Sequence, residues 1–281
     1  MLNSIKLFFK GFVIGISNLI PGLSGGTVAL ILGIYEEFLG ALGHLFQNFK
    51  KNIIFLAPVL TGMVFSLISL SGVISYCLTN FLFVTILFFC GAIFGGIPKI
   101  LKEMKGYHIS FGNTVSFILA FLAVTVPLML KGAEPSLSAT MTVSRFIILV
   151  LLGMVASSTM VMPGVSGSAV LMAVGYYHYI IDSLHSLSSP DSFATGISVV
   201  IPYGIGLALG LILASRLIEE CLKRWREKSF FAIMGFVVSS ILVILLQNDI
   251  LRLIPSLKIS EIVLGIILFL SGCFATAKLG D

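Results

Sequence analysis

The sequence predicts an all-α, multispanning membrane protein that is built as an inverted-topology repeat. Three observations support this fold class: an apolar composition, a glycine-rich motif that occurs twice, and an uneven placement of basic residues. Hydrophobic residues make up 58% of the chain and charged residues only 10%. About 25% of the residues of a soluble domain are charged. Because so few polar side chains cannot cover a water-soluble globule, the composition excludes a soluble fold.

The net charge of +5 does not indicate a nucleic-acid partner, because the basic residues lie in short loops between apolar runs. That placement is typical of residues that orient a protein in a membrane. No pair of cysteines has the spacing of a metal site or a redox motif. We therefore expect no nucleic acid, no metal and no cofactor. The cysteines are Cys77, Cys90, Cys221 and Cys273.

A glycine-rich motif interrupts the first apolar stretch and returns in the second half of the chain. The first motif is Pro21–Thr27, and the second motif is Pro163–Ala169. An offset of 142 residues aligns 11–42 with 153–184, and 10 of the 32 aligned positions are identical. The identical pairs are Gly11/Gly153, Val13/Val155, Pro21/Pro163, Gly22/Gly164, Ser24/Ser166, Gly25/Gly167, Val28/Val170, Gly33/Gly175, Tyr35/Tyr177 and Leu42/Leu184.

Six apolar runs are long enough to cross a bilayer, which requires about 20 residues. They are 53–76, 81–98, 111–130, 195–215, 230–246 and 260–277. The two motif segments differ, because a first arm leads into the motif and a second arm follows it. The first arm at 11–20 would rise about 15 Å and reach only the middle of the membrane. We therefore expect two re-entrant hairpins, at 11–43 and 146–181.

Basic residues favour hairpins over kinked full spans. With hairpins, 13 of the 17 lysines and arginines fall on the side of both termini, which is then cytoplasmic. With full spans, Lys50 and Lys51 would lie opposite Lys6 and Lys10, and this asymmetry would weaken. No small-residue cleavage site follows the N-terminal lysines, so we expect that segment to be retained.

Each half then contains one hairpin and three spans, which is an odd number of crossings. The first repeat is expected at 1–135 and the second, inserted upside down, at 136–281. Inverted repeats with broken helices near the midplane are typical of alternating-access transporters. Later segments agree at an offset of 144 residues, in the pairs Pro58/Pro202, Gly62/Gly206, Ser71/Ser215, Cys77/Cys221 and Gly91/Gly235.

The motifs have the residue types of an anion site. Backbone outside helices cannot face lipid, so these turns must be buried in protein or line a polar cavity. Proline ends the first arm, and Ser24 or Ser166 can cap the helix that follows. Free N–H groups are then expected at Gly25, Gly26 and Thr27, and likewise at Gly167 and Ser168. The alternative is that the small residues serve only close packing between helices.

Charged residues beside the hairpins are candidates for substrate entrance and ion coupling. Arg145 and Arg216 could gather an anion at the entrances, although both could equally be interfacial anchors. Glu36 and Glu37 lie late in the first hairpin, and His178 occupies the place of Glu36 in the second. An acid and a histidine at equivalent positions suggest proton coupling, and the alternative is two solvated arm ends.

The first motif also supports a resemblance to a known family. The run Asn18-Leu-Ile-Pro-Gly-Leu-Ser-Gly-Gly-Thr-Val-Ala, followed by Gly33-Ile-Tyr-Glu-Glu, resembles the signature of bacterial undecaprenyl-phosphate (polyprenyl-phosphate) translocases. This family was formerly catalogued as a domain of unknown function. The resemblance implies that the protein returns undecaprenyl phosphate, the lipid carrier of cell-wall precursors, from the outer to the inner leaflet of the bacterial cytoplasmic membrane. The second motif departs from the first at Ser168 and Ala169.

The residues expected to hold the lipid phosphate come from both motifs. They are Asn18, Gly22, Ser24, Gly25, Gly26 and Thr27 from the first copy and Gly164, Ser166, Gly167 and Ser168 from the second. A coupling ion, proton or sodium, is a further expected partner.

Two other functions compete with lipid transport. A channel or exchanger for small anions could use the same helix ends. An intramembrane serine protease could use the Gly-Leu-Ser-Gly-Gly sequence around Ser24. The histidines, however, lie in loops or arm ends rather than at the depth of the motif, so the serine lacks an expected base. We therefore expect a transporter and not an enzyme.

Overall fold

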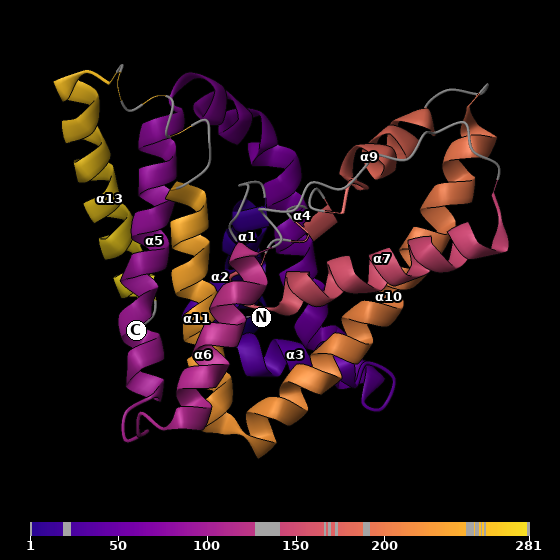
Figure 1. Cartoon of the computed structure of the whole chain (residues 1–281), viewed down its shortest axis with the longest axis horizontal. Coiled ribbons are helices and arrows are strands. Elements are labelled where there is room, and N and C mark those ends of the chain that lie inside the picture. The colour runs from indigo at the N-terminus through magenta and orange to yellow at the C-terminus, as the bar shows by residue number, and fades with distance from the viewer. Residues whose placement is uncertain are drawn as a thin grey trace.

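The computed structural model describes residues 2–18, 24–126, 141–165, 167, 170–171, 174–187, 192–245, 250, 253, 255 and 257–279. The described part of the first half is helical (Figure 1). These helices are α1 (Leu2–Asn18), α2 (Gly25–Ile31), α3 (Tyr35–Gly43), α4 (Phe49–Asn80), α5 (Leu82–Glu103) and α6 (Phe111–Thr125).

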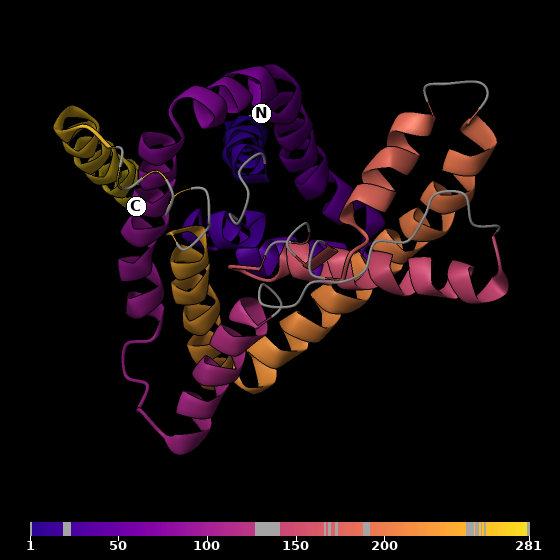
Figure 2. The same ribbon diagram turned by 45° about the horizontal axis from the view of Figure 1, so that its top comes forward.

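The second half repeats this order with helices of similar length. They are α7 (Val143–Val161), α9 (Tyr177–Ser186), α10 (Phe193–Arg224), α11 (Arg226–Leu245) and α13 (Ile259–Leu279). Helices α4 and α10 both have 32 residues and begin 144 positions apart. Helix α9 folds back beside the first part of α10 (Figure 2).

Within the described residues, six helices are long and apolar enough to cross a membrane: α4, α5, α7, α10, α11 and α13. Five of them contain or closely match the runs that the sequence predicted. The run 111–130 begins at α6, which has 15 described residues and ends at Thr125. Helix α7 was expected to be an arm of a hairpin, yet its 19 residues meet the length of a span.

Helix α1 is also longer than the expected arm at 11–20. It has 17 residues, which corresponds to about 25 Å. The helix continues through Lys6 and Lys10, because a lysine can keep its apolar stem along a helix while its charged end reaches a polar partner. The Lys10 Nζ donates to the carbonyl of Leu32 at 2.7 Å.

The local backbone structure repeats at the sequence offset. Gly33 and Gly175 both adopt positive φ, at 68° and 76°. The Ile34 N–H donates to the Ala29 carbonyl, and the Tyr176 N–H donates to the Leu171 carbonyl. This is the same six-to-one bond of a helix C-terminus in both halves. In each half it ends the arm after the motif and starts a further short helix, α3 or α9.

The first pair of long helices packs in the same way in both halves. A Cβ at Gly11 would lie 2.0 Å from the Val59 carbonyl oxygen, so α1 touches the backbone of α4 there. The equivalent Gly153 of α7 approaches the Tyr203 carbonyl of α10, where a Cβ would lie at 2.3 Å. Such close backbone approach is the role of small residues in membrane helix pairs.

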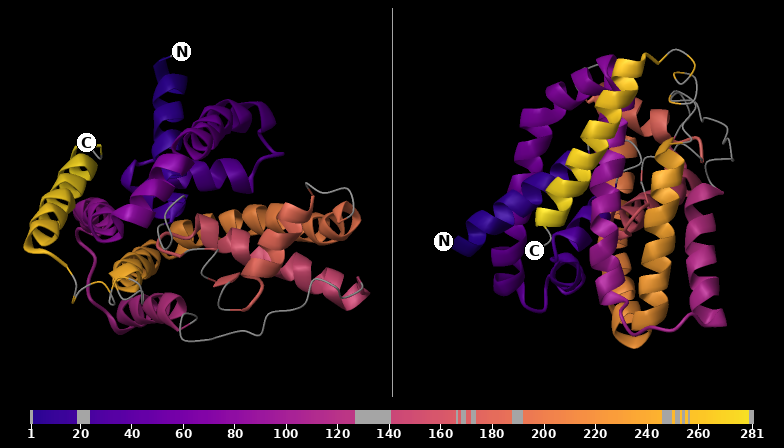
Figure 3. Two further views of the ribbon diagram at one scale, coloured as in Figure 1. Left: turned by 90° about the horizontal axis from the view of Figure 1, so that it is seen from above. Right: turned by 90° about the vertical axis from the view of Figure 1, so that its left-hand side faces the viewer.

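The later helices pair across the two halves rather than within them (Figure 3). Helix α5 packs on α13, and a Cβ at Gly91 would lie 2.0 Å from the Phe269 carbonyl oxygen. Helix α11 packs on α6, and a Cβ at the equivalent Gly235 would lie 2.4 Å from the Phe117 carbonyl oxygen. The third long helix of each half therefore completes its packing on the last helix of the other half.

Candidate functional site

The two motifs contact each other where the halves meet. The Ser24 hydroxyl donates to the carbonyl of Met162, directly before the second motif, at 2.8 Å. The backbone N–H of Gly164, in the second motif, donates to the Thr27 hydroxyl at 2.7 Å. Of the predicted phosphate ligands, Gly22, Ser166 and Ser168 lie outside the described residues. The structure therefore brings together three of the described candidates: Ser24, Thr27 and Gly164.

Ser24 caps α2, which confirms its predicted local role. Its backbone is extended, and its Oγ accepts the N–H of Gly26 at 3.2 Å. The Thr27 N–H donates to the Ser24 carbonyl at 3.1 Å. The expectation that Gly26 and Thr27 present free N–H groups is therefore wrong in this arrangement, because the first turn of α2 folds back on its own cap.

The C-terminal end of α7 is capped by side chains of the first half. The last carbonyls of a helix have no partner within the helix. Here the Val161 carbonyl accepts from the Tyr35 hydroxyl at 2.9 Å, and the Met162 carbonyl accepts from Ser24. Tyr35 is 2% exposed and Ser24 3% exposed. Hydroxyl groups from α3 and from the start of α2 thus satisfy buried carbonyls that would otherwise be costly.

Glycines make this approach of the two motifs feasible. A Cβ at Gly26 would lie 2.9 Å from the Val161 carbonyl oxygen. Gly164 has a φ of +79°, and a Cβ there would lie 2.3 Å from the Phe236 carbonyl oxygen of α11. A Cβ at Gly167 would lie 2.9 Å from the Ala156 carbonyl oxygen of α7. Small residues at these positions therefore serve close packing as well as the turn itself.

Two lysines hold the other end of α2. Lys10, on α1, donates to the Leu32 carbonyl, and Lys99, on α5, donates to the Ile31 carbonyl, both at 2.7 Å. Cations at a helix C-terminus satisfy its last carbonyls and favour its dipole. From the sequence, these lysines were expected only to orient the protein in the membrane, and their contacts with the end of α2 were not predicted. Tyr35 was also missed, although its recurrence as Tyr177 was a signal.

Asn18 and Gly25 adjoin each other at the entrance to the first motif. Asn18 is the last residue of α1 and is exposed. A Cβ at Gly25 would lie 2.9 Å from the Asn18 Oδ1, so the amide lies beside the start of α2. The exposed asparagine amide therefore borders the start of the first motif helix.

The coupling candidates occupy equivalent places at the starts of α3 and α9. Glu36 and His178 are each the second residue of their helix, and both are exposed, as is Glu37. Glu36 pairs with Arg226 of α11 at 3.1 Å. A pocket of about 310 Å³ is lined by this pair and also by Lys99 and Glu37.

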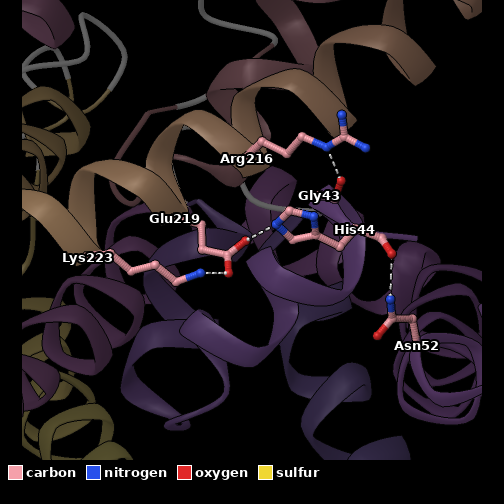
Figure 4. A network of polar contacts seen from close by, with 6 residues as sticks. All are labelled: Gly43, His44, Asn52, Arg216, Glu219 and Lys223. Atoms are coloured by element: carbon pink, nitrogen blue, oxygen red, sulfur yellow. Dashed lines mark hydrogen bonds and ion pairs between the residues drawn. The ribbon is translucent and has the colours of Figure 1, made fainter. Parts of the chain in front are cut away.

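The two entrance candidates stabilise contacts away from the motifs. The Arg145 guanidinium lies 5.6 Å from the Tyr179 ring centroid of α9. The Arg216 Nε of α10 donates to the Gly43 carbonyl at the end of α3 (Figure 4). Arg216 is therefore one of several α10 side chains that hold α3.

The same polar network contains a side-chain contact between the halves. His44, directly after α3, and Glu219 of α10 approach to 3.1 Å. The Lys223 ammonium lies 2.6 Å from the other oxygen of Glu219, as Figure 4 shows. The Asn52 amide of α4 donates to the His44 carbonyl at 2.8 Å. This network fixes α3 between α4 and α10.

An apolar cavity of about 180 Å³ lies beside α2. Its few polar side chains bond within their own helices: the Ser17 hydroxyl donates to Ile14, and the Thr276 hydroxyl donates to Gly272. A cavity without free polar partners disfavours water. The lining comes from α1, α2, α5 and α13: Val13, Ile16, Ser17, Val28, Ile31, Leu32, Phe88, Phe89, Ala92, Ile93, Ala275 and Thr276.

Comparison with known proteins identifies the family. Residues 14–258 match the VCA0040-like family, described as undecaprenyl phosphate translocase-like. The chain belongs to this family.

Across the part of the chain that the structure describes, no group of three or more His, Cys, Asp or Glu side chains could hold a metal ion.

Two curated relatives match most of the chain. A polyprenyl-phosphate transporter of Staphylococcus aureus is 32% identical over 237 residues, which are 83% of each chain. A polyprenyl-phosphate transporter of Vibrio cholerae is 23% identical over 257 residues, which are 85% of this chain and 77% of the relative. No solved structure matches the chain. Together with the six apolar helices, these matches identify an integral membrane transport protein.

Proposed function

We propose that the protein moves undecaprenyl phosphate from the outer to the inner leaflet of the bacterial cytoplasmic membrane by alternating access, without a chemical step. The observation that carries this proposal is the contact of Ser24, in the first motif, with Met162, directly before the second motif. It joins two broken-helix segments from different halves at one place. Both curated relatives are named polyprenyl-phosphate transporters, which supports this lipid class.

The phosphate is held by the motif residues when the motifs separate. A charged group at the bilayer centre costs about 2.5–3.5 kcal/mol on insertion scales, so a polar site there lowers the barrier to crossing. Ser24 and Thr27 supply hydroxyl groups, and Asn18 supplies an amide beside them. The backbone N–H of Gly164 becomes a donor once it leaves Thr27. Such a site binds an anion without a lysine or arginine among its ligands.

The two halves act as inverted repeats in this proposal. Equivalent helices have similar lengths. The packing between the halves is reciprocal, because α5 packs on α13 and its equivalent α11 packs on α6. The connections from α5 to α6 and from α10 to α11 lie at one end of the molecule (Figure 1). Both carry basic residues, which supports a cytoplasmic location of that end. The re-entrant path of the motif arms is part of the same proposal.

The apolar cavity beside α2 favours a lipid over a small anion. Its lining includes Val28, which follows Thr27 of the first motif in the same helix. Its volume of about 180 Å³ is below the ~300–1,000 Å³ typical of whole-ligand sites, so it suits one segment of a chain. We assign it to the first isoprenoid units behind the phosphate.

A small-anion channel or exchanger is the second candidate, since the motif hydroxyls would serve a free anion as well. A serine protease is disfavoured, because the Ser24 hydroxyl donates to the Met162 carbonyl rather than to a histidine base. The deciding experiment uses proteoliposomes. Protein-dependent exchange of labelled undecaprenyl phosphate between leaflets supports the proposal, and anion flux without lipid movement overturns it.

A further inference from the structure

The Ser24 hydroxyl has only one hydrogen to donate. It gives this hydrogen to the Met162 carbonyl at 2.8 Å, while its oxygen accepts the Gly26 N–H. A serine hydroxyl carries one donor and two acceptor lone pairs. A phosphate oxygen is only an acceptor when ionised, so it requires the hydrogen that Met162 already holds. The contact between the motifs and phosphate binding at Ser24 therefore exclude each other.

Tyr35 and Thr27 also stabilise the contact between the motifs, and both side chains are shielded from solvent. The Tyr35 hydroxyl donates to the Val161 carbonyl, one residue before the acceptor of Ser24. The Thr27 hydroxyl accepts the Gly164 N–H. Tyr35 is 2% exposed and Thr27 1% exposed. Three hydrogen bonds thus fix the end of α7 and the second motif against the first motif.

Helix α3, which Tyr35 begins, is tied to three helices of the second half. Tyr35 bonds the end of α7, and the next residue, Glu36, pairs with Arg226 of α11 at 3.1 Å. At the other end of α3, Gly43 accepts from Arg216 of α10. Because α3 is held at both ends, the Tyr35 ring has a fixed place against α7. Opening the motifs requires that this bond break.

We propose that Tyr35 is a positioning residue that holds the two motifs in a substrate-excluding arrangement, and that the lipid phosphate opens it by competing with the Met162 carbonyl for the Ser24 hydroxyl. The proposal rests on the proposed function, since it concerns how that substrate reaches its site. Tyr35 itself does not touch the phosphate. Its hydroxyl sets how often the motifs are apart and so how often Ser24 is available.

The sign of the Tyr35→Phe effect distinguishes this role from others. When the binding-competent state is only a minor fraction, the apparent Kd is the intrinsic Kd divided by that fraction. Loss of one hydrogen bond from the closed arrangement raises the fraction by about fivefold, from a net bond strength of about 1 kcal/mol. Tyr35→Phe should therefore bind polyprenyl phosphate about fivefold more tightly. A ligand role predicts weaker binding.

The experiment measures binding of undecaprenyl phosphate to the full-length protein in phosphatidylcholine nanodiscs. Tyr35→Phe is compared with Tyr76→Phe, a control on α4 at a residue that is 61% exposed. Tighter binding by Tyr35→Phe alone supports the proposal. Unchanged or weaker binding by Tyr35→Phe overturns it, even if the thermal midpoint falls. If the wild-type protein shows no saturable binding, the proposed function fails instead.

A second measurement keeps the test valid if Tyr35→Phe does not fold. The variant Met162→Cys keeps the backbone carbonyl that Ser24 uses and replaces a half-buried side chain. The native cysteines are first replaced by alanine, and labelling with a water-soluble maleimide is followed over time. Undecaprenyl phosphate should speed the labelling because it separates the motifs. A rate that does not change at saturating lipid contradicts the proposal.

Discussion

The imidazole of His44 lies 3.1 Å from the carboxylate of Glu219, and this pair joins α3 of the first half to α10 of the second. Glu219 is 15% exposed and His44 35% exposed, so the pair is partly shielded from solvent. The described structure packs α3 against α10 beside this pair.

Replacement of Glu219 should loosen this contact. Glu219→Gln removes the charge that both His44 and Lys223 face, and we expect the thermal midpoint to fall by a few degrees. The effect should shrink in high salt, because partly exposed ion pairs are screened. Glu220→Gln, at an exposed neighbouring position, is the matched control. Equal midpoints for the two variants would show that the pair adds no stability.

Removal of the Ser24 hydroxyl should abolish lipid exchange. Ser24→Ala loses the helix cap, worth about 0.5–2 kcal/mol, together with the donor that the phosphate needs. Gly25→Leu should do the same by filling the space beside Asn18. Both proteins should still insert in the membrane. Ser69→Ala is the control, since that exposed hydroxyl bonds only the preceding turn of α4. Wild-type exchange by Ser24→Ala removes the motif from the mechanism.

Filling the apolar cavity should distinguish the contribution of the lipid tail from that of the phosphate headgroup. Ala92→Phe places a ring in the cavity beside α2 and should slow exchange of undecaprenyl phosphate at least several-fold. Binding of inorganic phosphate, measured by calorimetry, should stay unchanged. Ala57→Phe on the exposed face of α4 is the control. Equal exchange by the two phenylalanine variants would argue against a tail site there.

The cross-half helix pairs should be sensitive to a single methyl group. Gly91→Ala would bring its Cβ to 2.0 Å from the Phe269 carbonyl oxygen, which forces α5 and α13 apart. We expect a loss of about 1–3 kcal/mol, typical of overpacking, seen as a lower thermal midpoint in detergent. Gly72→Ala should leave the midpoint unchanged, because nothing lies within 4 Å of a Cβ at that position. A tolerated alanine at Gly91 would mean that this helix pair separates readily.

Glu36 offers a test of proton coupling. Glu36→Gln removes an exposed carboxylate that pairs with Arg226. If transport is coupled to protons through this site, the variant should have a flatter pH dependence of lipid exchange than the wild type. Glu220→Gln, at an exposed position on α10 that is not a coupling candidate, is the comparison. An unchanged pH profile in Glu36→Gln excludes this residue from coupling.

The sequence predicted the membrane class, most long helices and the meeting of the two motifs. These features follow from composition, from run length and from an offset that can be counted. The cap at Ser24 was also predictable, because its chemistry is local to one turn. Lengths near the ends of helices were less accurate: α1 continues through Lys6 and Lys10, which apolar run length cannot reveal.

The contacts of the site could not be predicted, because they join residues far apart in the chain. Tyr35 and Val161 are 126 positions apart, and nothing in either local sequence names the other. The same holds for Lys99 and the end of α2. Arg216 was a candidate for an entrance residue or an interfacial anchor, and the sequence did not indicate its partner, the backbone carbonyl of Gly43. The charge of a residue alone does not predict which partner its side chain contacts.

The packing of helices from one half on helices from the other also limits when the fold can be completed during synthesis. While the chain enters the membrane from its N-terminus, the Gly91 face of α5 has no partner until α13, the last helix, arrives. Assembly therefore finishes only at the end of synthesis, and a chain that stops before Ile259 leaves a backbone-lined groove open to lipid. Two half-chains made separately should yield a transporter only when both are present in the same membrane.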